Sequence, residues 1–164
     1  RFHIFMGWDD LTKISAFLVY SGTTRIASQY YADIVLDSKK KEFELSIVEK
    51  TTEFELSQVF IYDQYVVVFR KVNDLVLILV GGLKSNELIF DQLLETMEAS
   101  MELIFKIPNM ENVVQQVEYL YFLIDETIDQ GFIFEGNPNV VASRVLLKND
   151  NSFSGKDMYH VSSF

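Results

Sequence analysis

The sequence predicts an α+β fold with one antiparallel sheet, and three observations carry this prediction. Five short runs rich in apolar, β-branched and aromatic residues are separated by turn residues, which is typical of strands. A charged helical segment follows the second run, and apolar spacing of three and four residues begins only after the fifth. Short links between consecutive strands favour antiparallel pairing. We therefore expect a five-stranded antiparallel sheet between one helix and two long C-terminal helices.

The first two strands and the first helix are expected in the first third of the chain. Residues 13–20 form the first strand, a Ser-Gly-Thr-Thr turn follows, and residues 25–31 pair back as the second. Asp37 or Ser38 is expected to cap the helix. That helix has an apolar face and is charged largely around the rest: Phe43, Ile47 and Val48 on the first, Lys39, Lys40, Lys41, Glu42, Glu44 and Glu49 on the second.

Three further strands are expected over residues 54–62, 65–70 and 75–80. The last of these is apolar at every position, which predicts a central strand covered on both faces. Residues 65–69 are almost as apolar, so this strand is placed beside it. An outermost strand with aromatic flanks, such as 54–62, would be sticky if left bare. We expect a helix or another chain to cover it.

After the fifth strand, apolar residues recur at the three- and four-residue spacing of a helix. Ser85 or Asn86 is expected to cap a first long helix, which the Pro-Asn pair at 108–109 breaks. A second long helix is expected over residues 110–130, with Gly131 as its C-terminal stop.

The end of the chain is expected to be less regular. A short final helix is possible over residues 139–144, and the chain is polar from Asn149 onward. The expected organisation is one domain over residues 13–148 and a polar C-terminal tail over residues 149–164.

Composition narrows the function classes. The formal net charge of −10 and the pI near 4.6 argue against nucleic acid as a partner and favour, weakly, a basic protein surface. The absence of cysteine excludes disulfides, thiolate metal sites and a cysteine nucleophile. No apolar run is long enough for a transmembrane segment, and the first residues do not have the pattern of a signal peptide.

Catalytic and cofactor motifs are sparse. The two histidines, His3 and His160, stand near the two ends, so a Ser/His/Asp triad or a two-histidine metal motif is not expected. The Gly-Gly pair at 81–82 lacks the lysine and further glycines of a phosphate loop. The lysine run at 39–41 fits a solvated helical turn better than a contact with lipid head groups. We expect no cofactor, no metal and no enzyme activity.

One cluster of carboxylates needs a physical reason. Asp125, Glu126 and Asp129 stand at the expected end of the second long helix, where the helix dipole favours cations. A basic partner, a metal, backbone donors of the following turn, or plain solvation would account for them. The spacing lacks the alternating oxygen ligands of a calcium loop, and the acid pair of a glycosidase would need a partner across a cleft, which the sequence does not show. A structural or partner-facing role is therefore favoured.

Three stretches of the sequence are similar to one family, the coatomer zeta subunits. The first is residues 14–20 with the turn and the segment 25–31, which matches the family's opening hairpin with its arginine and paired tyrosines. The second is the apolar strand 75–80 followed by Ser-Asn-Glu-Leu at 85–88. The third is the acidic segment 125–135. The resemblance runs from about Ile14 to Arg144.

The acidic segment separates this family from its relatives. Sigma chains of clathrin adaptors share the Asp-Glu pair but continue with Leu-Ala-Gly-Glu-Ile, whereas this chain continues with Thr-Ile-Asp-Gln-Gly-Phe. The signature residues, to which the resemblance gives a structural or partner-facing role, are Asp125, Glu126, Asp129, Gly131, Glu135 and Arg144.

The resemblance implies a longin-like fold and a non-catalytic role. Such a subunit packs on the gamma subunit of the heptameric coatomer (COPI) coat, which GTP-bound Arf recruits to Golgi membranes for retrograde Golgi-to-ER and intra-Golgi transport. It would therefore be cytoplasmic and peripheral on Golgi membranes and COPI vesicles. Three alternatives remain: a sigma-type small chain of a clathrin adaptor, a free longin-type regulator that binds a GTPase or SNARE, and an enzyme with an unrecognised carboxylate site.

Overall fold

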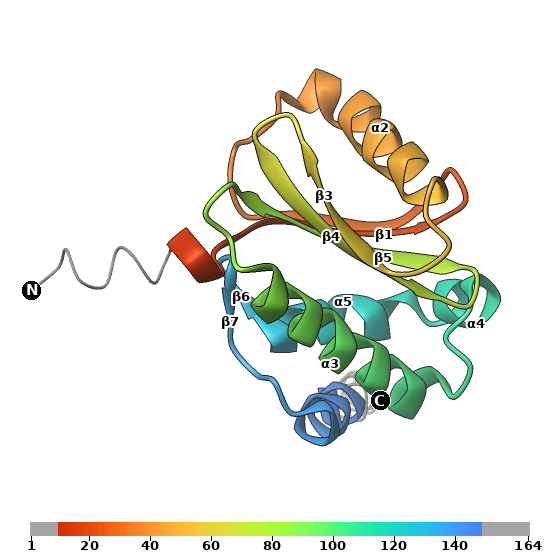
Figure 1. Cartoon of the computed structure of the whole chain (residues 1–164). Coiled ribbons are helices and arrows are strands. Elements are labelled where there is room, and N and C mark those ends of the chain that lie inside the picture. Colours follow the sequence, from red (N-terminus) through yellow and green to blue (C-terminus); the bar gives the residue numbers. More distant parts are fainter. Residues whose placement is uncertain (1–9, 149–164) are drawn as a thin grey trace, which may run out of the picture.

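Five strands form a single antiparallel sheet in the computed structural model, which describes residues 10–148 (Figure 1). The strand order is β2-β1-β5-β4-β3, and every neighbouring pair is antiparallel. The strands are β1 (Ile14–Ser21), β2 (Thr24–Tyr30), β3 (Gln58–Tyr62), β4 (Tyr65–Val72) and β5 (Leu75–Gly82). The predicted α+β fold with a five-stranded antiparallel sheet is confirmed.

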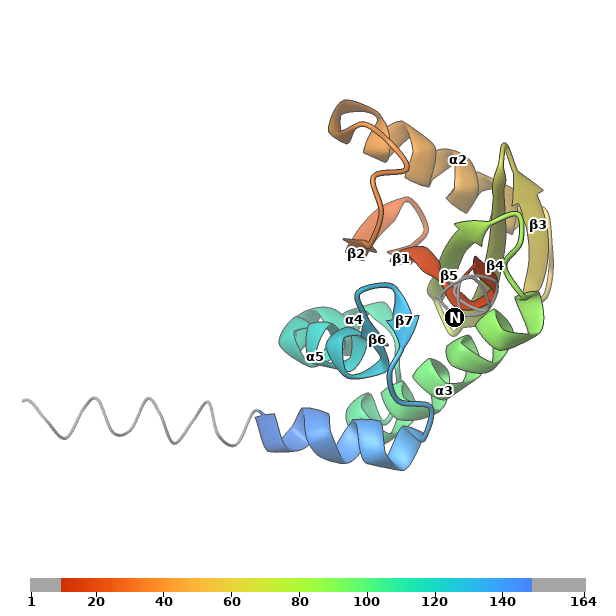
Figure 2. The same cartoon turned by 90° about the vertical axis from the view of Figure 1, so that its left-hand side faces the viewer.

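Helices cover both faces of this sheet (Figure 1). A 3₁₀ turn, η1 (Asp37–Lys39), leads into α2 (Lys40–Thr52), which lies alone on one face. The other face carries α3 (Glu87–Phe105), α4 (Met110–Gln115) and α5 (Val117–Thr127). A small hairpin follows, made of β6 (Ile128–Asp129) and β7 (Phe132–Ile133), and residues 138–148 form a further helix beside α3 and α5 (Figure 2).

The interior is divided by the sheet into two hydrophobic clusters. The larger lies under α3 and α5, and the smaller lies under α2. Residues of β5 alternate between them, with Leu77 and Leu79 in the first and Ile78 and Val80 in the second. The apolar run therefore forms the central strand, and β4 lies beside it, as the sequence predicts.

The edge strand β3 is shorter than expected. It begins at Gln58 rather than at Phe54, because the Phe54 ring packs instead against Phe60 and Phe69, with centroids 6.2 and 5.9 Å apart. Val59 and Ile61 are 41% and 66% exposed on this edge. Among residues 10–148 no strand pairs with the outer side of β3, so cover by another chain stays a prediction.

The N-caps of α2 and α3 differ. Asn86 caps α3 as expected, since its side chain accepts hydrogen bonds from the backbone N–H groups of Leu88 and Ile89 at 3.0 and 3.4 Å. The expected cap of α2 is wrong. Its N-cap is Lys39, without a side-chain cap bond, because Asp37 lies in the 3₁₀ turn and its carboxylate pairs with Lys40 at 2.6 Å.

The expected helix over residues 110–130 is also corrected. Gln116 leaves the helical conformation (φ −130°, ψ 45°) and separates α4 from α5, which ends at Thr127. The Thr127 hydroxyl donates to the carbonyl of Leu123 at 2.8 Å, and the next residue starts β6. The final helix is longer than predicted, over residues 138–148, and the expected tail at 149–164 lies outside the described residues.

Candidate functional site

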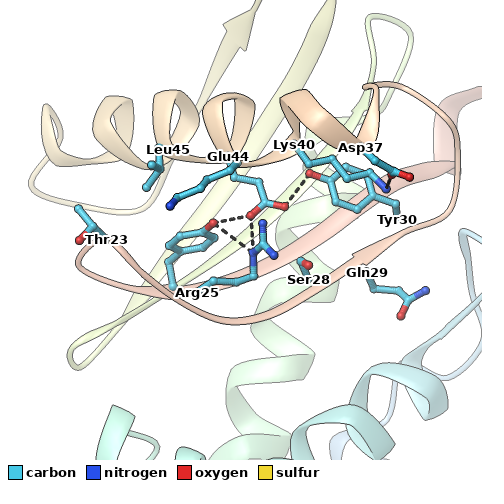
Figure 3. A pocket seen from close by; sticks show the side chains of 11 residues that line it. Thr23, Arg25, Ser28, Gln29, Tyr30, Asp37, Lys40, Glu44 and Leu45 are labelled. Atoms are coloured by element: carbon cyan, nitrogen blue, oxygen red, sulfur yellow. Dashed lines mark hydrogen bonds and ion pairs between the residues drawn. The ribbon is translucent and has the colours of Figure 1, made fainter.

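A polar cavity of about 830 Å³ opens between α2 and the β1–β2 hairpin (Figure 3). It brings together side chains from three elements: Tyr20 of β1, Arg25 and Tyr30 of β2, and Lys40 and Glu44 of α2. The hairpin turn and α2 are separate in sequence, so only the folded sheet assembles this group.

Glu44 is the centre of the group. Its side chain is fully buried, and its carboxylate accepts a hydrogen bond from Tyr30 Oη at 2.8 Å, one from Arg25 Nε at 2.7 Å and a further one from Tyr20 Oη. A buried carboxylate with three donors is satisfied. These bonds tie α2 to both strands of the hairpin, so we call this group the α2 clasp (Tyr20, Arg25, Tyr30 and Glu44).

Both tyrosines of the α2 clasp are held in the neutral form. Burial, and secondarily the hydrogen bond to Glu44, raises the pKa of Tyr20 to about 12. The same causes, in the same order, raise the pKa of Tyr30. At neutral pH both hydroxyls therefore act as hydrogen-bond donors rather than as bases.

Cations line the open side of the cavity. The Arg25 side chain is 44% exposed, and its Nε donates to Glu44 Oε2 at 2.7 Å and to Tyr20 Oη at 3.5 Å. Lys40 pairs with Asp37 at 2.6 Å and lies 4.5 Å from the centroid of the Tyr30 ring. Polar and charged groups thus dominate the opening, and the cavity suits a polar or anionic group better than an apolar one.

Glu44 was misplaced by the sequence prediction, which set it among the solvated charges of the helix. It lies on the same face as Ile47, Val48 and Thr51, all buried. The spacing of three, four and seven residues was the available signal, because a carboxylate on an apolar helical stripe is buried with its partners.

The acidic segment at the end of α5 lies in a different place, against the final helix. Glu126 is paired with two cations of that helix: Arg144 Nη1 lies 3.7 Å from Glu126 Oε2, and Lys148 Nζ lies 2.7 Å from Glu126 Oε1. The side chain of Glu126 is 12% exposed. Cations of the same chain therefore compensate a carboxylate that the helix dipole disfavours.

Glu135 connects this junction to the start of the final helix. Its Oε1 accepts hydrogen bonds from the backbone N–H groups of Gly136 and Asn137 at 3.1 and 3.0 Å, and its Oε2 lies 3.6 Å from Arg144 Nη1. Asn137 in turn caps the final helix by accepting from the Asn139 N–H at 3.0 Å. We call Glu126, Glu135 and Arg144 the acidic junction.

Gly131 does not end a helix. It occupies the turn of the β6–β7 hairpin with φ +88°, after Gln130 with φ +50°, which is the geometry of a two-residue hairpin turn. Its carbonyl accepts from Ile14 N–H at 2.7 Å, and a Cβ built on it would lie 2.7 Å from the Ile14 carbonyl oxygen. The position therefore requires glycine for conformation and for space.

The remaining two signature residues point to solvent. Asp125 and Asp129 are exposed, and neither makes an ion pair within the described part of the chain. Asp125 acts at a distance, since its charge adds to the burial that raises the pKa of Tyr31. Residues 10–148 contain no group of three or more carboxylates or histidines placed to hold a metal ion.

Comparison with known sequence families shows which family this chain belongs to. The sequence model of the clathrin adaptor complex small chain family matches residues 13–152, which include both the α2 clasp and the acidic junction. This chain belongs to that family. No helix in the described part is long and apolar enough to span a bilayer.

Individual relatives narrow the comparison to the coatomer zeta branch. Coatomer subunit zeta of Saccharomyces cerevisiae is 32% identical over 108 residues, covering 65% of this chain and 57% of the yeast protein. Coatomer subunit zeta-2 of Arabidopsis thaliana is 27% identical (80% and 76% covered), and probable coatomer subunit zeta-A of Dictyostelium discoideum is 28% identical (84% and 81%). The match thus spans a little over half of the yeast relative. The resemblance to coatomer zeta subunits is confirmed.

A structural comparison agrees on the fold. A chain of a structure described as a homology model of the full-length AP-3 complex in a stretched open conformation superposes with a TM-score of 0.72. Coverage is 88% of this chain and 98% of that chain, at 16% identity. Identity this low supports the longin-like fold alone.

Proposed function

We propose that this chain is a non-catalytic small subunit of a coatomer (COPI) coat, which packs on the gamma subunit and serves retrograde Golgi-to-ER and intra-Golgi transport. The observation that carries the proposal is the similarity to coatomer zeta subunits of yeast, a plant and Dictyostelium, within a family of adaptor small chains. In this reading the chain is cytoplasmic, joins the heptameric coat through gamma, and reaches Golgi membranes indirectly with Arf-GTP.

The chemistry of the described residues supports a scaffold role. Both histidines lie outside residues 10–148, and the α2 clasp holds its tyrosines neutral and its carboxylate fully hydrogen-bonded. The acidic junction is paired by cations of the same chain. In this proposal four signature residues are structural and fix the β6–β7 hairpin and the final helix: Glu126, Gly131, Glu135 and Arg144. The other two, Asp125 and Asp129, face a partner.

The division of the chain is part of the proposal. Residues 13–148 form the longin-like domain, and residues 149–164 form a separate polar tail. Limited proteolysis with mass spectrometry tests this: cleavage after about residue 148 that leaves a stable core agrees with it, and loss of the core together with the tail contradicts it.

Co-purification tests the function. The tagged chain, expressed in cells and recovered from cytosol, is expected to bring down the gamma subunit and the other coatomer subunits in mass spectrometry. Recovery of clathrin adaptor large subunits instead would assign a sigma-type small chain. Recovery of a GTPase or SNARE without any large helical subunit would assign a free longin-type regulator.

A further inference from the structure

The negative charge of this protein is concentrated in one layer. Residues 85–143 hold eleven of the 24 aspartates and glutamates but only one of the 14 lysines and arginines, Lys106. This stretch builds α3, α4, α5 and the β6–β7 hairpin, on the side of the sheet away from α2 (Figure 2). The final helix of the same layer adds Arg144 and Lys148, so residues 85–148 carry eleven acidic and three basic side chains, a formal charge of −8.

Helix α3 carries the longest row of these charges. Its carboxylates recur every three or four residues and no lysine or arginine interrupts them: Glu87, Asp91, Glu95, Glu98 and Glu102. Arg70 of β4 pairs with Asp91 at 3.6 Å and with Glu98. Among the described residues the other three make no ion pair. Like charges at this spacing destabilise a helix, so a cation from outside the chain would stabilise this face.

A second row of side chains on α3 runs beside the acidic row, and each of its residues follows an acidic residue in the sequence. It has exposed leucines at both ends and smaller or polar residues between them: Leu88 (71% exposed), Gln92, Thr96, Ala99 and Leu103 (50% exposed). Next to its middle lies a groove of about 420 Å³ between α3 and the segment from Ile133 to Pro138. Ile89, Leu93 and Ile133 make its apolar lining.

The shape and charge of this face point to one kind of occupant. The small side chain of Ala99 lets another backbone approach closely, and leucines at the two ends of the row offer apolar contact. Beside it, the Thr96 hydroxyl already donates to the carbonyl of Gly136 at 3.1 Å. A helix of 19 residues is about 28 Å long, enough for a partner helix of similar length. Because the acidic row of α3 runs along the contact, the partner helix must carry lysine or arginine along one side.

We propose that the outward face of α3 is the docking surface for a basic amphipathic helix of the large coat subunit. This inference rests on the proposed function and names the surface and the charge that the subunit uses. Apolar side chains of the partner fill the groove, and its cations pair with Glu95 and Glu102.

The test is binding of the purified chain to the purified gamma subunit held on a surface. The association and dissociation rates are measured. The variant Glu95→Lys with Glu102→Lys reverses two exposed charges that form no ion pair in the described part, although the charge of Glu95 also acts on Arg70. We expect association about tenfold slower at low salt, and a salt dependence much weaker than that of the unaltered chain. Ala99→Trp, which fills the groove, is expected to weaken binding mainly through faster dissociation.

The matched control carries the same change of charge on the other layer. Glu49→Lys with Glu53→Lys alters two exposed glutamates at the end of the α2 segment and should leave both rates within twofold. Thermal unfolding of all variants alone verifies that each one folds.

The outcomes separate the inference from the proposed function. Equal loss of association in the α3 and the α2 variants, or no loss in either, overturns the inference while the heterodimer itself stands. A chain that binds no large subunit overturns both. A dimer of this chain alone that the α3 variant abolishes would assign the face to a second copy and would also overturn the inference.

Discussion

Arg25 Nε donates a 2.7 Å hydrogen bond to Glu44 Oε2, and only the arginine end of this pair reaches solvent. The Glu44 side chain is fully buried, whereas that of Arg25 is 44% exposed. Burying a carboxylate costs desolvation energy that its partners offset, so such a group adds little net stability. Its effect is on position, because α2 can bury Glu44 only where all three donors meet it.

Removing the carboxylate tests this. Glu44→Ala leaves the Tyr20 and Tyr30 hydroxyls without their acceptor, and each orphaned donor costs about 1–3 kcal/mol. We expect the free energy of unfolding in urea to fall by about 2–5 kcal/mol. Glu42→Ala on the exposed side of the same helix is the control, with an expected change within about 0.5 kcal/mol. Equal effects of the two substitutions would contradict a structural role for the α2 clasp.

The tyrosines of the α2 clasp predict a loss of stability in alkali. The folded state raises the pKa of Tyr20 to about 12 and also raises that of Tyr30, so the unfolded chain releases these protons first. Stability contributed by the neutral tyrosines is therefore complete below about pH 10, the ordinary pKa of tyrosine, and falls as the pH rises toward 12. Urea unfolding across this range measures it. In the double variant Tyr20→Phe with Tyr30→Phe this part of the pH dependence should disappear.

The hairpin turn predicts a glycine requirement. Gly131→Ala places a Cβ 2.7 Å from the Ile14 carbonyl oxygen and forces alanine to φ +88°, so we expect a loss above about 1 kcal/mol. Gly136→Ala is the matched control, since nothing lies within 4 Å of a Cβ at that position. Thermal unfolding of both variants compares them, and an equal shift in melting temperature would argue against the strained turn.

The two cations on Glu126 predict non-additive effects. Arg144→Ala or Lys148→Ala alone should cost less than about 1 kcal/mol, because both side chains are more than 40% exposed and the other cation remains. The double variant leaves Glu126, 12% exposed, without a cation and should cost more than the sum of the two singles. A double-mutant cycle by urea unfolding at low and high salt measures this, and strict additivity would contradict the shared pairing.

Sequence patterns predicted the sheet and the capped helix because their signals are local. An all-apolar run such as Leu75–Val80 fits only a strand covered on both faces, and Asn86 stands directly before an apolar helical period. The irregularities depend on contacts with distant residues. Gln116 is an ordinary helix former, so nothing local predicts a break at this residue. A glycine after an apolar helical period is typical of a helix stop, which was the prediction for Gly131, whereas its place in a hairpin turn depends on the contact with the distant Ile14.

Only part of the candidate site could be predicted from the sequence, for the same reason. The family resemblance indicated Arg25, Tyr30 and the acidic segment. Glu44, which accepts hydrogen bonds from both Arg25 and Tyr30, lies among charged residues of its helix and was therefore expected to face solvent. The cations that pair with Glu126 come from a helix that was expected to end at Arg144, before Lys148. Local periodicity finds elements, whereas ion pairs between elements require the tertiary arrangement.

The uneven charge of the two layers gives this small protein a large electric dipole. In the field of a charged surface, the molecule turns its acidic helical layer toward positive charge and its nearly balanced α2 side toward negative charge. A basic protein approaching in solution meets the acidic side first. The charge thus orients the molecule before any specific contact forms, and this orientation fades as salt screens the field.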